Sequence, residues 1–183
     1  YIALAKSVLA EGKSVILLVP EIALTSQLVH NFQQYFEHVT LLHSEQTEAV
    51  RHQLWQKTLE TDGPQLIIGP RSALFAPVRE LGLIIIDEAH EPAYHQDQNP
   101  KYSALRLASQ MSRTILGTAT PLISDYYLAK QHDAIISLDE LAVKSDKHAT
   151  VHTLDFKDRS QLTRNRFISD PLIASIQNSL NHK

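Results

Sequence analysis

The sequence predicts an α/β fold in which helices cover both faces of a doubly wound, mostly parallel β-sheet. Short runs of consecutive apolar residues, typical of strands buried on both faces, alternate with longer segments whose apolar residues recur at helical spacing. This alternation is the pattern of a parallel sheet. Polar clusters directly follow several apolar runs, and such sheets bind ligands at the carboxyl ends of their strands. We therefore expect a functional site at that edge.

The first half of the chain carries the clearest elements. Residues 1–11 form a predicted helix that ends at Gly12, because glycine favours the left-handed backbone of a helix C-terminus. The apolar run at 15–19 predicts a buried strand. The same spacing rules predict a helix at 25–36, a strand at 39–42, a helix at 45–59 and a buried strand at 66–69. The apolar residues of the 45–59 helix that we expect to face the core are Val50, Leu54, Trp55 and Leu59.

The second half repeats the pattern less regularly. The apolar run at 83–86 predicts a buried strand, and a polar segment fills 91–101. Ser169, Asp170 and Pro171 are expected to begin a last amphipathic helix. The remaining predicted elements are a helix at 102–111, a strand at 114–117, a helix at 123–130, a sixth strand at 134–136 and an edge strand at 150–156.

Two carboxylates and a histidine directly follow the strand at 83–86. Asp87 and Glu88 would emerge at the carboxyl edge of the sheet, which is the layout of a Walker B element. In such an element one carboxylate holds Mg²⁺ and the next orients the water that attacks a nucleoside triphosphate. A strand that ends in an ordinary charged turn is the alternative. The spelling Asp-Glu-Ala-His at 87–90 favours a nucleoside triphosphatase.

A phosphate-binding loop is not predicted at residues 12–14, although Gly-Lys-Ser imitates the end of one. The loop motif requires a glycine five residues before Gly12, where Ser7 stands. It also lies between a strand and the following helix, whereas this triplet follows a helix and precedes a strand. We therefore expect an ordinary helix C-terminus there.

Composition narrows the function classes. The chain has 183 residues, a net charge of −3 and no cysteine, so nucleic-acid binding through bulk charge, a disulfide framework and a thiolate zinc site are not expected. No apolar run approaches the roughly 20 residues of a membrane span. We interpret the ten histidines as surface or core residues, with His90 as the exception. We expect a cytoplasmic protein that does not contact a membrane.

Four polar strings at predicted strand ends resemble the motifs of superfamily 2 helicases of the DEAH type. In chain order they are 19–25 (Val-Pro-Glu-Ile-Ala-Leu-Thr, motif Ia), 69–77 (Gly-Pro-Arg-Ser-Ala-Leu-Phe-Ala-Pro, motif Ib), 87–90 (motif II) and 117–121 (Gly-Thr-Ala-Thr-Pro, motif III). The full spelling of the first two, and the segment 94–102 after motif II, resemble the PriA family of replication-restart helicases.

This resemblance implies the first RecA-like lobe of a P-loop nucleoside triphosphatase, a 3′→5′ DNA helicase that uses ATP and Mg²⁺. It implies single-stranded and forked DNA as partners, together with primosome and replication-restart proteins. The family's Walker A loop would lie just before Tyr1, and its second lobe and zinc sites would lie outside this chain. The chain alone is therefore expected to be nearly inactive. Residues 1–141 would form the lobe, and 142–183 an inter-lobe segment with a C-terminal helix.

The resemblance assigns catalytic roles at motifs II and III. Asp87 would hold Mg²⁺, Glu88 would activate water, and His90 would couple the nucleotide state to motif III or to the other lobe. Thr118 and Thr120 would pass that state on through their hydroxyl groups. As alternatives, His90 is a helix-start histidine bonded to the sheet, and the two threonines cap a helix before Pro121.

The predicted DNA contacts come from motifs Ia and Ib and from the segment 94–102. Pro70 stands where the family usually has threonine and offers no backbone N–H, so the motif candidates are the side chains of Thr25, Arg71 and Ser72. In the segment 94–102 the candidates are Tyr94, His95 and Tyr102, which would stack on bases, and Lys101, which would meet a phosphate. The alternative is a solvated loop that its tyrosines anchor to the core.

Other interpretations stay open at this point. The basic residues Lys157, Arg159, Arg164 and Arg166 either touch DNA or form a solvated surface. Motif II alone would also suit an RNA helicase or a restriction-type translocase. A module that grips single strands or a partner protein without turnover is a further alternative.

Overall fold

The computed structural model describes residues 1–20, 26–43, 45–139, 151, 153–157 and 159–181. The chain divides into two compact units, Tyr1–Ile136 and Ser137–Lys183, and each is described by itself. The first unit holds the β-sheet and all the motif residues that the structure describes. The expected boundary between residues 141 and 142 stays a prediction.

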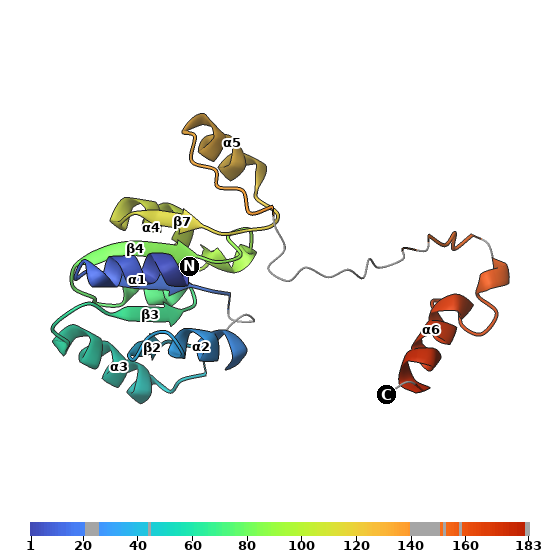
Figure 1. Cartoon of the computed structure of the whole chain (residues 1–183), viewed down its shortest axis with the longest axis horizontal. Helices are drawn as coiled ribbons and strands as arrows, with labels where there is room; N and C mark the ends of the chain where they lie inside the picture. The colour runs from blue at the N-terminus through green and yellow to red at the C-terminus, as the bar shows by residue number, and fades with distance from the viewer. Residues whose placement is uncertain (21–25, 44, 140–150, 152, 158, 182–183) are drawn as a thin grey trace. The chain divides into compact units, whose positions relative to one another are not determined.

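A five-stranded parallel sheet forms the centre of the first unit (Figure 1), in the order β2-β3-β1-β4-β7. Every neighbouring pair of strands is parallel. The strands are β1 (Ser14–Leu18), β2 (Val39–Leu41), β3 (Leu66–Gly69), β4 (Leu81–Ile86) and β7 (Thr114–Leu116). The central strands β1 and β3 are buried along their whole length, as continuous apolar runs predict.

Helices cover both faces of this sheet, as expected for a doubly wound fold. On one face Leu17 and Ile85 pack with Ala5 of α1 (Ile2–Ala10) and with Phe32 of α2 (Ser26–Gln33). On the other face Ile16 and Ile84 pack with residues of the 3₁₀ helix η2 (Arg71–Phe75) and of α4 (Ala104–Met111). Neighbouring strand residues thus face opposite layers, because side chains alternate along a strand.

The other elements lie outside the five-stranded sheet and its covering helices. A small antiparallel hairpin of β5 (His95–Gln96) and β6 (Tyr102–Ser103) follows the 3₁₀ helix η3 (Pro92–Tyr94). The remaining elements are α3 (Glu48–Glu60) and α5 (Ile123–Gln131) in the first unit, and η4 (Arg159–Gln161) and α6 (Asp170–Asn181) in the second. No helix of the described part of the chain is long and apolar enough to cross a membrane.

The residues 12–14 end helix α1, as predicted. Gly12 has a φ of +80°, and its N–H donates to Leu9 O at 3.0 Å. The Lys13 N–H donates to Val8 O at 3.2 Å, so the last carbonyls of the helix are satisfied. The predicted start of the last helix is also confirmed, since Ser169 Oγ accepts the Leu172 N–H at 3.4 Å.

The predicted inward face of helix α3 is wrong for three of its four residues, and only Leu54 is partly buried. Val50, Trp55 and Leu59 are 40%, 48% and 43% exposed, and the only fully buried side chain of the helix is Thr58. Helix α3 connects β2 to β3, and β2 is an edge strand of the sheet. At an edge, neighbouring elements cover less of a helix surface than they do at the centre of the sheet. Apolar spacing identified a face but could not show what covers it.

Three elements predicted in the second half of the chain differ from the structure. Residues 134–136 form no strand, and Ile136 is 86% exposed. The described residues of 150–156 form no strand either, with Val151 also 86% exposed. Apolar runs fit a strand pattern, but a strand needs a neighbour that takes its backbone hydrogen bonds. Helix α4 begins at Ala104 rather than residue 102, because Tyr102 and Ser103 pair with β5.

Candidate functional site

The motif strings lie side by side at the carboxyl edge of the sheet. The Asp87 N–H donates to Leu18 O at 2.9 Å, and the Val19 N–H donates to Gly69 O at 2.9 Å. The Gly117 N–H donates to Ile86 O at 2.8 Å. These bonds extend the strand pairing past the strand ends, so the parallel sheet brings motifs Ib, II and III, and the start of motif Ia, together as predicted.

Asp87 is fixed at its backbone, while part of its carboxylate is left open. Its side-chain Oδ1 accepts a hydrogen bond from the Tyr1 hydroxyl at 2.8 Å, and its backbone carbonyl accepts one from the Tyr94 hydroxyl at 2.5 Å. Burial and then the hydrogen bond to Asp87 raise the pKa of Tyr1, so its hydroxyl remains a donor at neutral pH. Among the described residues, Oδ2 of Asp87 has no hydrogen-bond partner. An oriented carboxylate with one open oxygen suits a metal ligand.

Glu88 occupies a strained backbone conformation directly after Asp87. Its φ is +47°, in the left-handed region that costs a residue with a Cβ atom about 1 kcal/mol or more. Its Oε2 lies 3.4 Å from His90 Nδ1, and its side chain is 46% exposed. Strain of this kind collects at functional sites, because the surroundings must hold it in place.

His90 and Thr118 link motif II to motif III. Nδ1 of His90 and Oγ1 of Thr118 form a hydrogen bond of 2.9 Å, whose donor depends on the imidazole tautomer. Thr118 Oγ1 also accepts the Thr120 N–H at 3.1 Å. The helix-cap alternative for the threonines is not supported, because helix α5 has Leu122 at its N-cap and no side-chain cap. His90 lies in a turn rather than at a helix start.

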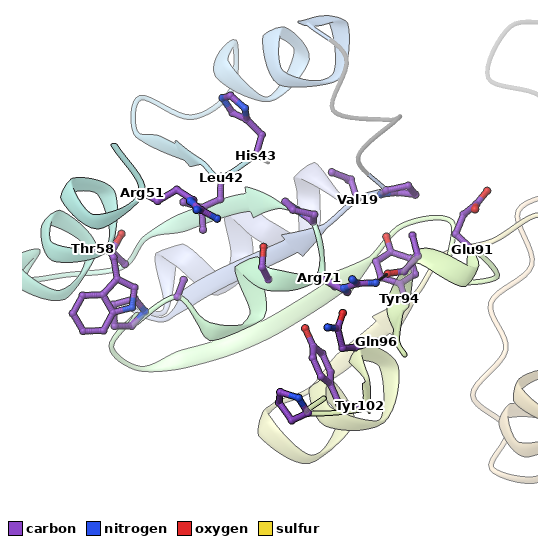
Figure 2. Close-up of a pocket in the computed structure, with 18 residues that line it drawn as sticks. Val19, Leu42, His43, Arg51, Thr58, Arg71, Glu91, Tyr94, Gln96 and Tyr102 are labelled. Atoms are coloured by element: carbon purple, nitrogen blue, oxygen red, sulfur yellow. Dashed lines mark hydrogen bonds between the residues drawn. The ribbon is translucent and has the colours of Figure 1, made fainter. Parts of the chain in front are cut away.

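A cavity of about 670 Å³ opens beside the motif residues. Figure 2 shows its walls, which come from the ends of β1, β2 and β3, from helix α3, from η2 and from the segment after β4. Arg51 and Trp55 of α3 line it together with Arg71, Ser72 and Tyr102. A concave surface with aromatic rings and arginines suits a nucleic-acid strand.

The structure divides five of the seven predicted DNA contacts into three groups. Ser72 is exposed and lines the cavity, and Tyr102 lines it while its ring stands edge-on to Phe75 with the centroids 5.5 Å apart. His95 and Lys101 are exposed but are not part of the cavity wall. Thr25 lies outside the described residues.

Arg71 lines the cavity, but part of its guanidinium is engaged within the protein. Nη1 donates to Ala93 O at 2.7 Å and to His95 O at 2.9 Å. No partner of Nε or Nη2 is found among the described residues. Those two nitrogens remain available to a ligand in the cavity.

The prediction that Tyr94 stacks on a base is wrong. Its side chain is only 1% exposed and packs in the core with Ile86, Ala89 and Ala104, so neither ring face is open to a base. Burial and then the charge of Asp87 raise the pKa of Tyr94, which keeps the hydroxyl protonated and donating. The alternative interpretation, in which tyrosines anchor this segment to the core, holds for Tyr94.

Three residues of the site were missed by sequence reasoning. Arg51 and Trp55 are four residues apart on helix α3, a spacing that places them on one helix face, but Trp55 was assigned to the core. Tyr1 contacts Asp87 across 86 positions of sequence, and no sequence signal indicated that contact.

The predicted basic cluster lies in the second unit. Lys157, Arg159, Arg164 and Arg166 are all exposed, and none forms an ion pair with a described residue. The Arg164 backbone N–H donates to Asp170 Oδ1 at 3.2 Å, and the charge of Arg164, after the hydrogen bonds from Thr163, contributes to lowering the pKa of Asp170. A role for this cluster in DNA binding stays a prediction.

Comparisons with known proteins agree with the geometry. A sequence model of the DEAD/DEAH box helicase family matches residues 1–127. Replication restart protein PriA from Chlamydia trachomatis is 36% identical across 98% of this chain and 25% of its own length. The proteins of that name from Bacillus subtilis and Helicobacter pylori are 39% and 43% identical, across 72% and 64% of this chain and 17% and 20% of their own lengths.

This chain therefore spans a quarter or less of the length of these three relatives. The family model covers more than half of the chain, and the parallel sheet with helices on both faces has the RecA-like architecture of that family. The chain belongs to the DEAD/DEAH box helicase family, and within it the chain is similar to replication restart protein PriA.

Proposed function

We propose that this chain forms the first nucleotide-binding lobe of an ATP-dependent DNA helicase that acts in replication restart. The protein would move 3′→5′ along single-stranded DNA at forked substrates and would work with primosome proteins. The relatives' shared name and the family match support the helicase class over a restriction-type translocase. The observation that carries the proposal is the position of Asp87, which presents one open carboxylate oxygen at the strand ends beside motif III.

The residues present fit ATP with Mg²⁺. Magnesium in such enzymes is held by one or two carboxylates together with phosphate oxygens, rather than by a cage of protein ligands. Asp87 offers one such carboxylate, and the described residues contain no group of three or more metal-ligating side chains. The ion would neutralise charge that develops on the phosphates. Asp87 would hold it through Oδ2, while the Tyr1 hydroxyl keeps Oδ1 in place.

Glu88 would orient or deprotonate the attacking water, and His90 would transmit the nucleotide state to motif III. The side chain of Glu88 is 46% exposed, so its carboxylate can accept a proton from a water molecule or orient it. Nδ1 of His90 lies 3.4 Å from Glu88 Oε2 and 2.9 Å from Thr118 Oγ1. A change in the position of Glu88 during turnover would therefore reach motif III through two short contacts.

Single-stranded DNA would occupy the cavity beside these motifs. Ser72 and the free nitrogens of Arg71 would bind phosphates, and Tyr102 would stack on a base. His95 and Lys101 would contact the strand outside the cavity. We also propose that the 183-residue chain alone hydrolyses ATP poorly, because it spans a quarter or less of the length of the relatives from Chlamydia trachomatis and Bacillus subtilis.

The test is the substitution Asp87→Asn in the full-length protein that contains this chain. The amide keeps the size of the side chain but loses the charge that holds Mg²⁺, so DNA-stimulated ATP hydrolysis should fall by roughly 100-fold or more, comparable to removing one preorganised electrostatic contact. The affinity for single-stranded DNA should stay close to that of the wild type.

Asp133→Asn is the matched control. Asp133 is exposed and lies outside the site, so the same chemical change there should leave hydrolysis unchanged. Wild-type turnover by the Asp87→Asn protein would show that the Walker B assignment is wrong. An RNA-stimulated activity without a response to DNA would favour the RNA-helicase alternative.

A further inference from the structure

The segment that follows motif II is held from the cavity side by Arg71. Nη1 of Arg71 donates to the carbonyls of Ala93 and His95, at 2.7 Å and 2.9 Å. These carbonyls flank Tyr94 in the sequence, so one guanidinium nitrogen fixes the backbone on both sides of that residue. Figure 2 shows Arg71 and Tyr94 side by side at one end of the cavity.

The same segment is held from the sheet side by the Tyr94 hydroxyl. It donates to Asp87 O at 2.5 Å and to Leu18 O at 3.2 Å. The ring is buried in the core, so its position is set by packing as well as by these bonds. Leu18 O also accepts the Asp87 N–H, whereas the Tyr94 hydroxyl is the only partner of Asp87 O among the described residues.

We propose that Arg71 is a positioning residue for Asp87 and acts through Tyr94. The guanidinium holds the backbone at 93–95, that backbone holds the Tyr94 ring, and the ring's hydroxyl holds the peptide group of Asp87. The inference rests on the proposed function, in which Asp87 binds Mg²⁺. It differs from a DNA-contact role for Arg71, because positioning affects hydrolysis even when no DNA is bound.

Arginine suits this role for a geometric reason. One terminal nitrogen carries two N–H groups in a fixed plane, and here they meet two carbonyls of one short segment. Glutamine is too short to reach both carbonyls from the same backbone position. Lysine retains the charge but ends in a flexible ammonium group, so Arg71→Lys separates charge from geometry.

The first readout does not depend on ATP. Hydrogen–deuterium exchange of the 183-residue chain should show faster exchange at residues 87–96 in Arg71→Gln and Arg71→Lys. Arg106→Gln is the matched control, because Arg106 is exposed on helix α4 and forms no ion pair with a described residue. Unchanged exchange at 87–96 in both Arg71 variants would overturn the proposal.

The second readout is ATP hydrolysis by the full-length protein without DNA. Arg71→Gln and Tyr94→Phe should each lower kcat by about 10- to 100-fold with little change in KM, as changes to groups that support a metal ligand do. The kcat of the double variant should be no lower than the kcat of the less active single variant, because both changes break the same chain of contacts. Basal kcat equal to wild type in Arg71→Gln, or multiplicative losses in the double variant, would refute the inference.

DNA binding distinguishes the competing role. If Arg71 acted only as a phosphate ligand, Arg71→Gln would lower the salt dependence of single-strand binding by about 0.7 in the log–log slope and leave basal hydrolysis intact. Asp87→Asn is measured in parallel. If Asp87→Asn keeps full activity, the proposed function fails, while the exchange result still decides whether Arg71 holds the segment.

Discussion

The close approach of β3 to the end of β2 predicts a specific stability loss for Gly69→Ala. Gly69 ends β3 and leads directly into Pro70 and Arg71 of the cavity wall. A Cβ atom at this position would lie 2.8 Å from Leu42 O and 3.0 Å from Ala73 Cβ. A backbone oxygen and a Cβ atom cannot rotate away, so the β2 end and η2 would have to separate from β3.

Overpacking of this kind costs about 1–3 kcal/mol, which for a chain of this size lowers Tm by roughly 2–4 °C per kcal/mol. The assay is urea unfolding of the 183-residue chain, followed by the fluorescence of its one tryptophan. We expect a lower unfolding midpoint and an unchanged m-value, because the folded state is strained while the surface exposed on unfolding stays the same.

Gly12→Ala is the control for Gly69→Ala. No atom lies within 4 Å of a Cβ at Gly12, but its φ is +80°, so the substitution strains only the backbone and costs about 1 kcal/mol. A wild-type midpoint in Gly69→Ala, with the expected loss in Gly12→Ala, would show that β2 and β3 do not meet as closely as described.

Two further predictions concern Tyr1 and Asp170. A Cβ at Gly117 would lie 1.6 Å from the Tyr1 hydroxyl oxygen, so Gly117→Ala should displace the ring from Asp87. Gly117→Ala and Tyr1→Phe should then lower ATP hydrolysis of the full-length protein equally and non-additively; independent losses would contradict this. Hydrogen bonds from the Thr163 hydroxyl and from the backbone lower the pKa of Asp170. These bonds therefore stabilise the second unit at neutral pH, and the stabilisation is lost as the pH falls through the lowered pKa of Asp170. An NMR titration of the Thr163 amide should have its midpoint below 3.8, and a midpoint at or above 3.8 would contradict the hydrogen bonding.

The sheet could be predicted from sequence because its central strands are buried on both faces. Runs such as residues 15–19 and 83–86 contain only apolar side chains, and few structures other than a covered parallel strand bury such a run. The predictions were wrong where an apolar pattern needs a neighbouring strand or a covering layer, which the local sequence does not specify. Ile136 and Trp55 both fit an apolar spacing, but no neighbouring strand pairs with the first and no second layer fully covers the other.

The candidate site was predicted where chain order and sheet geometry act together. Because strand ends in a parallel sheet share one edge, the adjacency of Asp87, His90 and Thr118 follows from their positions directly after strands. Tyr94 was assigned to DNA because the segment 94–102 resembles the aromatic-rich loop of the helicase family. Its burial depends on backbone carbonyls of Asp87 and Leu18, and backbone acceptors are invisible in a sequence.

The backbone around Asp87 is held by hydrogen bonds within the protein. The Asp87 N–H and C=O are both bonded within the protein, and the Ala89 N–H donates to Gly117 O at 2.9 Å. With the peptide groups on either side fixed, the left-handed φ of Glu88 is held in place, and movement is left to the side chains. The contact between His90 and Thr118 is a side-chain contact of this kind, so nucleotide-dependent motion would pass to motif III by rotation about side-chain bonds rather than by displacement of the strands.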